Sequence, residues 1–280
     1  MHRVGAANPV HRRALIVENV PIARDTYRLR LADETIAGSI RPGQFVMIRP
    51  ASDGSSDPLL GRPLALYDVV HDASGIAIGF DVVYLVIGRG TAALARRRAG
   101  EHLAVWGPLG NGFGPAPGGP ALFVAGGIGQ TPFLALGREW LAAGRDACPS
   151  ATLLYGVRTA ALLAGVDDFR AAGVTVEIAT DDGSAGHHGF VTELLSRRLE
   201  RGERPARVVG CGPPAMLAAL ARLTARHGID CDVSLENHMA CGFGACFSCV
   251  APIRQADGSS DLRRVCLEGP VFPAGAVAWA

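Results

Sequence analysis

The sequence of 280 residues contains no lysine, and all 27 of its basic side chains are arginines. This absence excludes several classes of enzyme, because a P-loop needs its lysine on the nucleotide phosphates, a protein kinase needs its strand lysine, and Schiff-base chemistry needs an amine. The chain has 26 acidic side chains, so its formal net charge is only +1. So small a net charge gives no field that would draw the chain to nucleic acid or to an anionic membrane, and we expect neither as a partner.

Long apolar segments are also missing from the sequence. It has no run of about 18 consecutive apolar residues, the length that a membrane-spanning helix requires, and its beginning, MHRVGAANPVHRR, lacks the apolar stretch of a secretion signal. Charged residues make up 19% and hydrophobic residues 49% of the chain, which predicts a globular protein with a large core. We therefore expect a cytoplasmic protein, and the length predicts two domains with a small appendage.

The first part of the chain, from residue 14 to residue 112, consists of short strand-like runs. Runs such as RALIVENV, YRLRLA and GQFVMIRP are separated by glycine, proline and aspartate, a pattern typical of an antiparallel barrel or sandwich. One segment, TAALARRRAG, predicts a helix with Thr91 as its N-cap. Residues 108–120 hold four prolines and five glycines, which predicts a domain boundary there.

After this boundary, apolar strands alternate with helices. ALFVAGG, TLLYGV, VTVEIATDD and ARVVGCG are each followed by a helical pattern, which predicts a doubly wound parallel sheet with helices on both faces. The alternation stops at Asp230, where a cysteine-rich tail begins that has a hairpin-like turn at residues 255–258. The expected organisation is a barrel over residues 10–114, an α/β domain over residues 119–229 and a small domain over residues 230–280.

Four of the seven cysteines gather in this tail with the spacing C-x4-C-x2-C-x16-C, and the first three match the plant-type spacing of [2Fe–2S] ligands. The small or apolar residues between them suit a loop whose backbone amides turn toward cluster sulfurs. A structural zinc site is the alternative, although zinc ligands usually come as two short hooks and the fourth cysteine here stands alone. The other three cysteines are expected to be small buried residues rather than ligands. The predicted ligands are Cys241, Cys246, Cys249 and Cys266, and the others are Cys148, Cys211 and Cys231.

Two glycine-rich turns follow buried strands in the α/β part of the chain. Residues 124–132 read VAGGIGQTP, and residues 209–216 read VGCGPPAM. Such a turn lets a pyrophosphate approach the N-terminus of the next helix, although tight packing alone also explains its glycines. Both turns lie at the carboxyl ends of strands, where open α/β sheets bind their ligands. We expect the thiol of Cys211 to project into that crevice, beside a nicotinamide.

Eight short motifs follow one another along the chain: RPLAL, GRGT, GPLGNGF, AGGIGQTP, YGVRT, TDDGSAG, GCGPPAM and CGFGACFSC. In this order, and over nearly the whole length, they resemble the electron-transfer subunits of dihydroorotate dehydrogenase B, within the ferredoxin–NADP reductase superfamily. The resemblance implies an N-terminal FAD-binding barrel, an NAD-binding domain and a C-terminal [2Fe–2S] domain. It also implies a heterotetramer with two copies of a separate FMN-containing catalytic subunit that oxidises dihydroorotate.

The resemblance assigns residues to the cofactors. Arg62 would pair its guanidinium with the FAD pyrophosphate, and Ala65 stands where the family has a serine, so it offers the flavin no hydroxyl. No residue is expected to act as a catalytic acid or base, because the cofactors carry the chemistry. The residues implied on the FAD side are Arg62, Pro63, Leu64, Ala65, Val83, Tyr84, Leu85, Gly90 and Thr91. Those implied on the NAD side are Gly126, Gly127, Gly129, Thr131, Cys211 and Gly212.

The implied function is electron transfer between two-electron and one-electron carriers. NAD exchanges hydride, a [2Fe–2S] cluster exchanges single electrons, and a flavin does both. The expected route runs from an FMN partner subunit through the cluster and FAD to NAD⁺, in pyrimidine biosynthesis. Two alternatives stay open: an NAD(P)H-dependent reductase subunit serving a hydrogenase, a ferredoxin or another oxidoreductase, and a non-enzymatic module whose tail is held by zinc.

Overall fold

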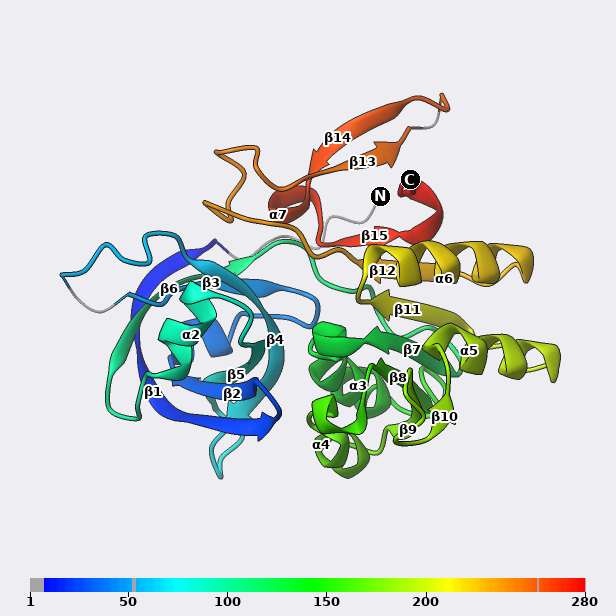
Figure 1. The fold of residues 1–280 in the computed structure, drawn as a ribbon, viewed down its shortest axis with the longest axis horizontal. Helices are drawn as coiled ribbons and strands as arrows, with labels where there is room; N and C mark the ends of the chain where they lie inside the picture. Colours follow the sequence, from blue (N-terminus) through cyan, green and yellow to red (C-terminus); the bar gives the residue numbers. More distant parts are fainter. Residues whose placement is uncertain (1–7, 52–53, 256, 280) are drawn as a thin grey trace.

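The computed structural model describes residues 8–51, 54–255 and 257–279 and places them in a barrel, a layered α/β unit and a C-terminal hairpin (Figure 1). The barrel is closed by six antiparallel strands in the order β1-β2-β5-β4-β3-β6. This confirms the antiparallel barrel that the strand pattern predicts, and closure leaves the barrel without a free sheet edge. Its strands are β1 (Val10–Ala23), β2 (Thr26–Ala32), β3 (Phe45–Arg49), β4 (Arg62–His71), β5 (Ala77–Leu85) and β6 (His102–Leu109).

Two short helices accompany the barrel, α1 (Glu34–Ala37) and α2 (Arg89–Ala95). The start of α2 differs from the sequence-based expectation, because its N-cap is Gly88 and Thr91 lies within its first turn. There the Thr91 hydroxyl accepts hydrogen bonds from the backbone amides of Ile87 at 3.0 Å and Gly88 at 3.3 Å. The prediction of Thr91 as the N-cap is therefore wrong, although its hydroxyl still satisfies amides at the helix start.

The α/β unit is built on a seven-stranded sheet in the order β10-β9-β8-β7-β11-β12-β15. All neighbouring strands from β10 to β12 are parallel, and β15 runs antiparallel to β12. The chain starts at β7, builds outward through β8 and β9, and then returns to the other side of β7 with β11, which confirms the doubly wound prediction. The strands are β7 (Ala121–Gly126), β8 (Ala151–Val157), β9 (Thr175–Thr180), β10 (His187–His188), β11 (Arg207–Cys211), β12 (Cys231–Ser234) and β15 (Val271–Pro273).

Helices cover both faces of this sheet. α3 (Phe133–Ala142) and α4 (Val166–Ala171) share one hydrophobic core with the sheet, and α5 (Val191–Glu200) and α6 (Pro214–Arg226) share another. None of the helices in the described ranges is both long enough and apolar enough to cross a membrane. The remaining short elements are η1 (Gly127–Gln130), η2 (Ala160–Leu162), α7 (Val265–Glu268) and η3 (Ala274–Ala276).

The C-terminal tail is interleaved with the sheet. β12 and β15 both join the sheet, and between them the chain forms the cysteine loop and a hairpin of β13 (Val250–Arg254) and β14 (Ser260–Arg264), drawn above α6 in Figure 1. The predicted turn at residues 255–258 joins these two antiparallel strands, and its residue 256 lies outside the described residues. The change of sequence pattern at Asp230 thus marks no break in the sheet, and the division into three domains stays a prediction.

Asn111, in the segment between barrel and sheet, ties the tail to both. Its side-chain amide donates to the carbonyls of Glu268 at 3.3 Å and Val271 at 2.9 Å, and its side-chain oxygen accepts from the Val271 amide at 3.0 Å. Its own backbone amide donates to the carbonyl of Gly269 at 2.6 Å. The segment predicted as a domain boundary is therefore also an anchor for the tail.

We expect Asn111→Ala to destabilise the protein, because it removes three side-chain hydrogen bonds from partly buried backbone groups. At about 0.5–1.5 kcal/mol for each bond, the free energy of unfolding should fall by roughly 2–4 kcal/mol, measured by urea denaturation. Asn237→Ala is the control and should cost less, since the Asn237 side chain makes two hydrogen bonds: it donates to the Val250 carbonyl at 3.0 Å and accepts from the adjacent His238 amide at 2.9 Å. Equal losses in the two variants would contradict the anchoring role of Asn111.

Candidate functional site

A cleft with a volume of about 640 Å³ lies between the barrel, the carboxyl end of the parallel sheet and the start of the tail. The barrel contributes residues of β4, β5 and α2, the sheet contributes both glycine-rich turns, and the tail contributes residues 234–239 and Trp279. The predicted cofactor residues line this cleft, except Gly90 and Gly129, which are buried beside lining residues. The structure thus brings the residues predicted for the FAD side and those predicted for the NAD side together in one cleft. The role of each residue stays a prediction.

The two motifs assigned to the FAD side, RPLAL at residues 62–66 and GRGT at residues 88–91, contact each other at Arg62. Its Nη1 atom donates to the carbonyls of Leu60 at 2.8 Å and Gly61 at 3.1 Å, so the guanidinium folds back over its own turn. A Cβ atom at Gly90 would collide with this guanidinium, so a larger residue there would require the Arg62 side chain to move. A positive charge thus lies beside helix-start amides that have no partner within the helix, an arrangement that suits a phosphate.

The wall of the cleft formed by β4 and β5 is apolar. Ala65 lies opposite Phe45 of β3 and presents only a methyl group. Tyr84 is 1% exposed, its ring stacks on Tyr27 at 5.8 Å between centroids, and its hydroxyl donates to the side-chain oxygen of Asn19 at 2.9 Å. Burial raises the pKa of Tyr84 above its ordinary value. Both the ring and the hydroxyl of Tyr84 therefore have partners within the barrel, Tyr27 and Asn19.

The two glycine-rich turns lie side by side, at the point where β7 and β11 pair and the strand order reverses. A Cβ atom at Gly129 would collide with the Cys211 carbonyl, and one at Gly126 would lie 2.8 Å from the sulfur of Met216. Gly127 has φ +57°, and a Cβ atom there would meet nothing within 4 Å, so its backbone faces open space at the cleft. The turns are thus packed against each other on one side and open to a ligand on the other.

Cys211 and Glu236 face each other at the cleft, with 3.8 Å between the sulfur and a carboxylate oxygen. Burial raises the pKa of the Cys211 thiol well above its ordinary value, and the nearby Glu236 carboxylate adds to the shift. Burial also raises the pKa of Glu236. At neutral pH the thiol is therefore uncharged and a poor nucleophile, so it can pack beside a planar ring without reacting.

Sequence reasoning missed the tail residues that complete the cleft. Residues 234–239, with the sequence SLENHM, begin with the last residue of β12 and precede Cys241, the first predicted cluster ligand. Because β12 is parallel to β11, its carboxyl end reaches the same edge of the sheet as the two glycine-rich turns. Recognising a strand at residues 231–234 would predict this contribution, but the sequence pattern indicates only the start of an irregular tail there.

The four predicted metal ligands gather in the loop after β12 and at the start of α7. Cys246 contacts Cys241, and Cys266 contacts Cys249. Within the described part of the chain, no three histidine, cysteine or carboxylate side chains converge as a single metal ion would require. Two thiol pairs suit a [2Fe–2S] cluster, in which each iron takes two protein ligands, better than one tetrahedral zinc.

The cysteine loop is shaped to hold such a cluster. Gly242, Gly244 and Phe247 have φ values of +80°, +87° and +56°, so the backbone coils tightly between the ligands. Hydrogen bonds from the hydroxyl and amide of Ser248 lower the pKa of the exposed Cys246 thiol to about 6. Because the thiolate is the form that binds metal, this donor set fits an iron–sulfur cluster.

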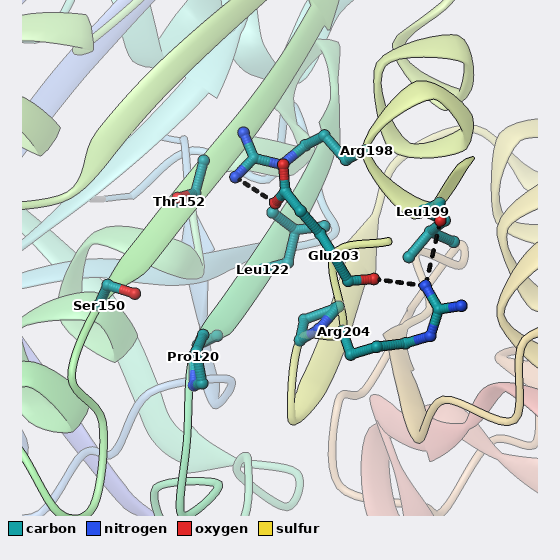
Figure 2. A pocket seen from close by; sticks show the side chains of 10 residues that line it. Pro120, Leu122, Ser150, Thr152, Arg198, Leu199, Glu203 and Arg204 are labelled. Carbon is teal, nitrogen blue, oxygen red and sulfur yellow. Dashed lines mark hydrogen bonds and ion pairs between the residues drawn. The ribbon is translucent and has the colours of Figure 1, made fainter. Parts of the chain in front are cut away.

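A second hollow, of about 260 Å³, lies at the opposite edge of the sheet, lined by the beginnings of β7 and β8 and by the end of α5 with its following loop (Figure 2). Its main charges are already paired, since Arg198 contacts Glu203 at 2.8 Å and also contacts Glu177. None of the residues predicted from the sequence lines it. The cleft at the carboxyl end of the sheet is therefore the candidate site.

Two family models match this chain. The iron–sulfur cluster binding domain of dihydroorotate dehydrogenase B matches residues 236–278, and the oxidoreductase NAD-binding domain matches residues 123–222. A solved structure described as an NADH-dependent reduced ferredoxin–NADP oxidoreductase superposes with a TM-score of 0.80 at 28% identity, over 99% of this chain and 92% of that one. The shared fold includes the barrel, the sheet and the tail.

Curated relatives match over almost their whole length. The dihydroorotate dehydrogenase B (NAD(+)) electron transfer subunit of Desulforamulus reducens is 35% identical over 259 residues, which cover 92% of this chain and 94% of the relative. The protein of the same name from Bacillus caldolyticus is 38% identical over 259 residues, which cover 91% and 94%. The chain belongs to the family of dihydroorotate dehydrogenase B electron-transfer subunits.

Proposed function

We propose that this chain passes electrons between a catalytic partner subunit and NAD, by way of a [2Fe–2S] cluster in the cysteine loop and an FAD in the cleft. The observation that carries the proposal is the single cleft that collects the residues of both predicted nucleotide sites next to the cysteine loop. The family relationship supports the same conclusion, because the relatives are named as NAD⁺-linked electron transfer subunits of dihydroorotate dehydrogenase B.

The chain's own residues would bind and orient the cofactors. Arg62 and the first turn of α2 would hold the FAD pyrophosphate, and the apolar wall of β4 and β5 would lie along the flavin. The glycine-rich turns would admit the NAD phosphates, with the neutral thiol of Cys211 beside the nicotinamide. Bound flavin supplies the exchange between hydride and single electrons. The cluster ligands would be Cys241, Cys246, Cys249 and Cys266.

The substrate is expected to be handled by the partner. A subunit named for electron transfer implies a catalytic subunit, and we propose that this partner carries FMN, oxidises dihydroorotate to orotate and assembles with this chain as a heterotetramer of two copies each. Dihydroorotate would give up two electrons there, and NAD⁺ would gain two electrons and a proton as hydride at this chain's cleft. A role in pyrimidine biosynthesis follows from that substrate.

A second candidate is a reductase that exchanges electrons with ferredoxin. It is favoured by the likeness to the NADH-dependent reduced ferredoxin–NADP oxidoreductase structure, which extends over 99% of this chain. The same cleft and cysteine loop would serve either function, because only the protein that docks at the cluster differs. The identity of the partner therefore separates the two candidates.

Purified alone, the chain should transfer electrons from NADH to an artificial acceptor but should not oxidise dihydroorotate. Adding the FMN-containing partner should create dihydroorotate-dependent formation of NADH, followed by the ordinary near-ultraviolet absorbance of NADH. Rapid dihydroorotate oxidation by the chain alone would contradict the division of labour. Reduction of ferredoxin without dihydroorotate activity in any complex would favour the second candidate.

Cys246→Ser should abolish the cluster, because it removes one ligand from the exposed end of the loop. Iron should fall from about two atoms per chain to nearly none, and the visible absorption and low-temperature EPR signal of the reduced protein should disappear. Cys231→Ser is the matched control, since Cys231 lies on β12, and its thiol bonds the Asp232 carbonyl. Retention of iron by the Cys246 variant would count against Cys246 as a ligand, and zinc in place of iron in the wild type would count against the cluster.

Arg62→Ala should weaken FAD binding, because the chain has no lysine that could share the pyrophosphate charge. A charge-assisted hydrogen bond contributes about 1.5–3 kcal/mol, so the dissociation constant of FAD should rise roughly ten- to hundredfold. Gel filtration followed by flavin absorbance measures the loss. Arg12→Ala is the control, since Arg12 lies on the barrel surface and bonds the Thr35 hydroxyl. Equal flavin retention in both variants would refute the role of Arg62.

A further inference from the structure

Two barrel side chains lie between the cysteine loop and the turn that carries Arg62. They are Met47 on β3 and Trp106 on β6, which are partners in the antiparallel register of these strands. The indole nitrogen of Trp106 donates to the backbone carbonyl of Cys241 at 2.8 Å, although the two residues are 135 positions apart in the chain. The first predicted cluster ligand is thus held directly by a barrel residue.

The same two side chains also contact the turn on the FAD side. A Cβ atom at Gly61, the residue before Arg62, would lie 2.5 Å from the Trp106 ring and 3.3 Å from the Met47 methyl group. On the other side, a Cβ atom at Gly242 would lie 2.5 Å from Met47 Cγ. Glycine at both positions lets the turn and the loop close onto this pair from opposite sides.

The pair is held in place by its surroundings. Met47 is fully buried in the hydrophobic core that also contains Cys249 and Cys266, and Trp106 packs against that core. The ring of His11 stacks on the indole, with 6.2 Å between ring centroids and 21° between planes. Side chains packed in this way keep one rotamer, so the contact with Cys241 has a fixed geometry.

We infer that Trp106, supported by Met47, is a positioning residue that fixes the Cys241 end of the cluster against the FAD-side turn and raises the reduction potential of the cluster. This inference rests on the proposed function. A cluster becomes more negative on reduction, so dipoles that make its surroundings less negative raise its potential. The indole N–H offsets the negative end of the Cys241 carbonyl and should act in this direction. Because Trp106 and Met47 contact both the cysteine loop and the turn at Gly61, they also fix the distance between that loop and that turn.

Trp106→Phe keeps an aromatic ring and removes the N–H donor. We expect the variant to retain iron and flavin, to show a lower midpoint potential of the cluster in an EPR-monitored redox titration, and to reduce the cluster several-fold more slowly after mixing with NADH. Trp140→Phe is the matched control, because the Trp140 indole also donates to a backbone carbonyl, that of Gly114 at 3.1 Å, but lies in the core around α3. Its potential should equal that of the wild type.

Gly61→Ala tests the coupling from the other side, since its methyl group would press on the Trp106 ring without changing the cysteine loop. Gly61 lies next to Arg62 and belongs to the FAD side of the cleft. We nevertheless expect its substitution to shift the EPR spectrum and the midpoint potential of the cluster, because the added methyl group acts through Trp106. A wild-type cluster potential and EPR spectrum in both the Trp106 and the Gly61 variants would overturn the inference. A wild-type protein that binds no iron would instead overturn the proposed function.

Discussion

Barrel residues Met47 and Leu109 pack in the same buried core as Val208 of the sheet and the cysteines Cys249 and Cys266 of the tail. Because protein interiors are close-packed, none of the three parts can move relative to the others without opening cavities or breaking this core. The spacing between the cleft and the cysteine loop is therefore set by packing. Electron transfer through fixed cofactors needs such a constant arrangement, and the shared core supplies it.

Much of this arrangement is readable from the sequence, because the signals are local. Alternating strands and turns predict the barrel, apolar strands followed by helices predict the doubly wound sheet, and the cysteine spacing predicts the cluster ligands. Both glycine-rich turns end strands, so their meeting at one edge of a parallel sheet follows from topology alone. For that reason the two turns on the NAD side line one cleft, whereas the residues on the FAD side reach it from the barrel.

The features that the sequence does not predict depend on contacts between distant segments or on very short elements. Nothing near Trp106 in the sequence indicates Cys241, which lies 135 residues later. β12 and β15 have four and three residues, too few for a periodic pattern, so the tail could not be recognised as part of the sheet. Threonine is a common N-cap residue, yet the N-cap of α2 is Gly88, three residues before Thr91. Local residue preferences do not fix the residue at which a helix begins.

The interleaving of tail and sheet explains how so small a cluster segment can be held firmly. The cysteine loop and its hairpin leave the sheet after β12 and return to it at β15, and these two strands pair with each other. The loop is therefore an insertion between two paired strands at the edge of the sheet, so both of its ends are fixed. Asn111 closes the same base from the barrel side through its bonds to Glu268 and Val271. Since both ends of the insertion are fixed in the same core, through Val233 of β12 and Phe272 of β15, the cluster segment needs little hydrophobic core of its own.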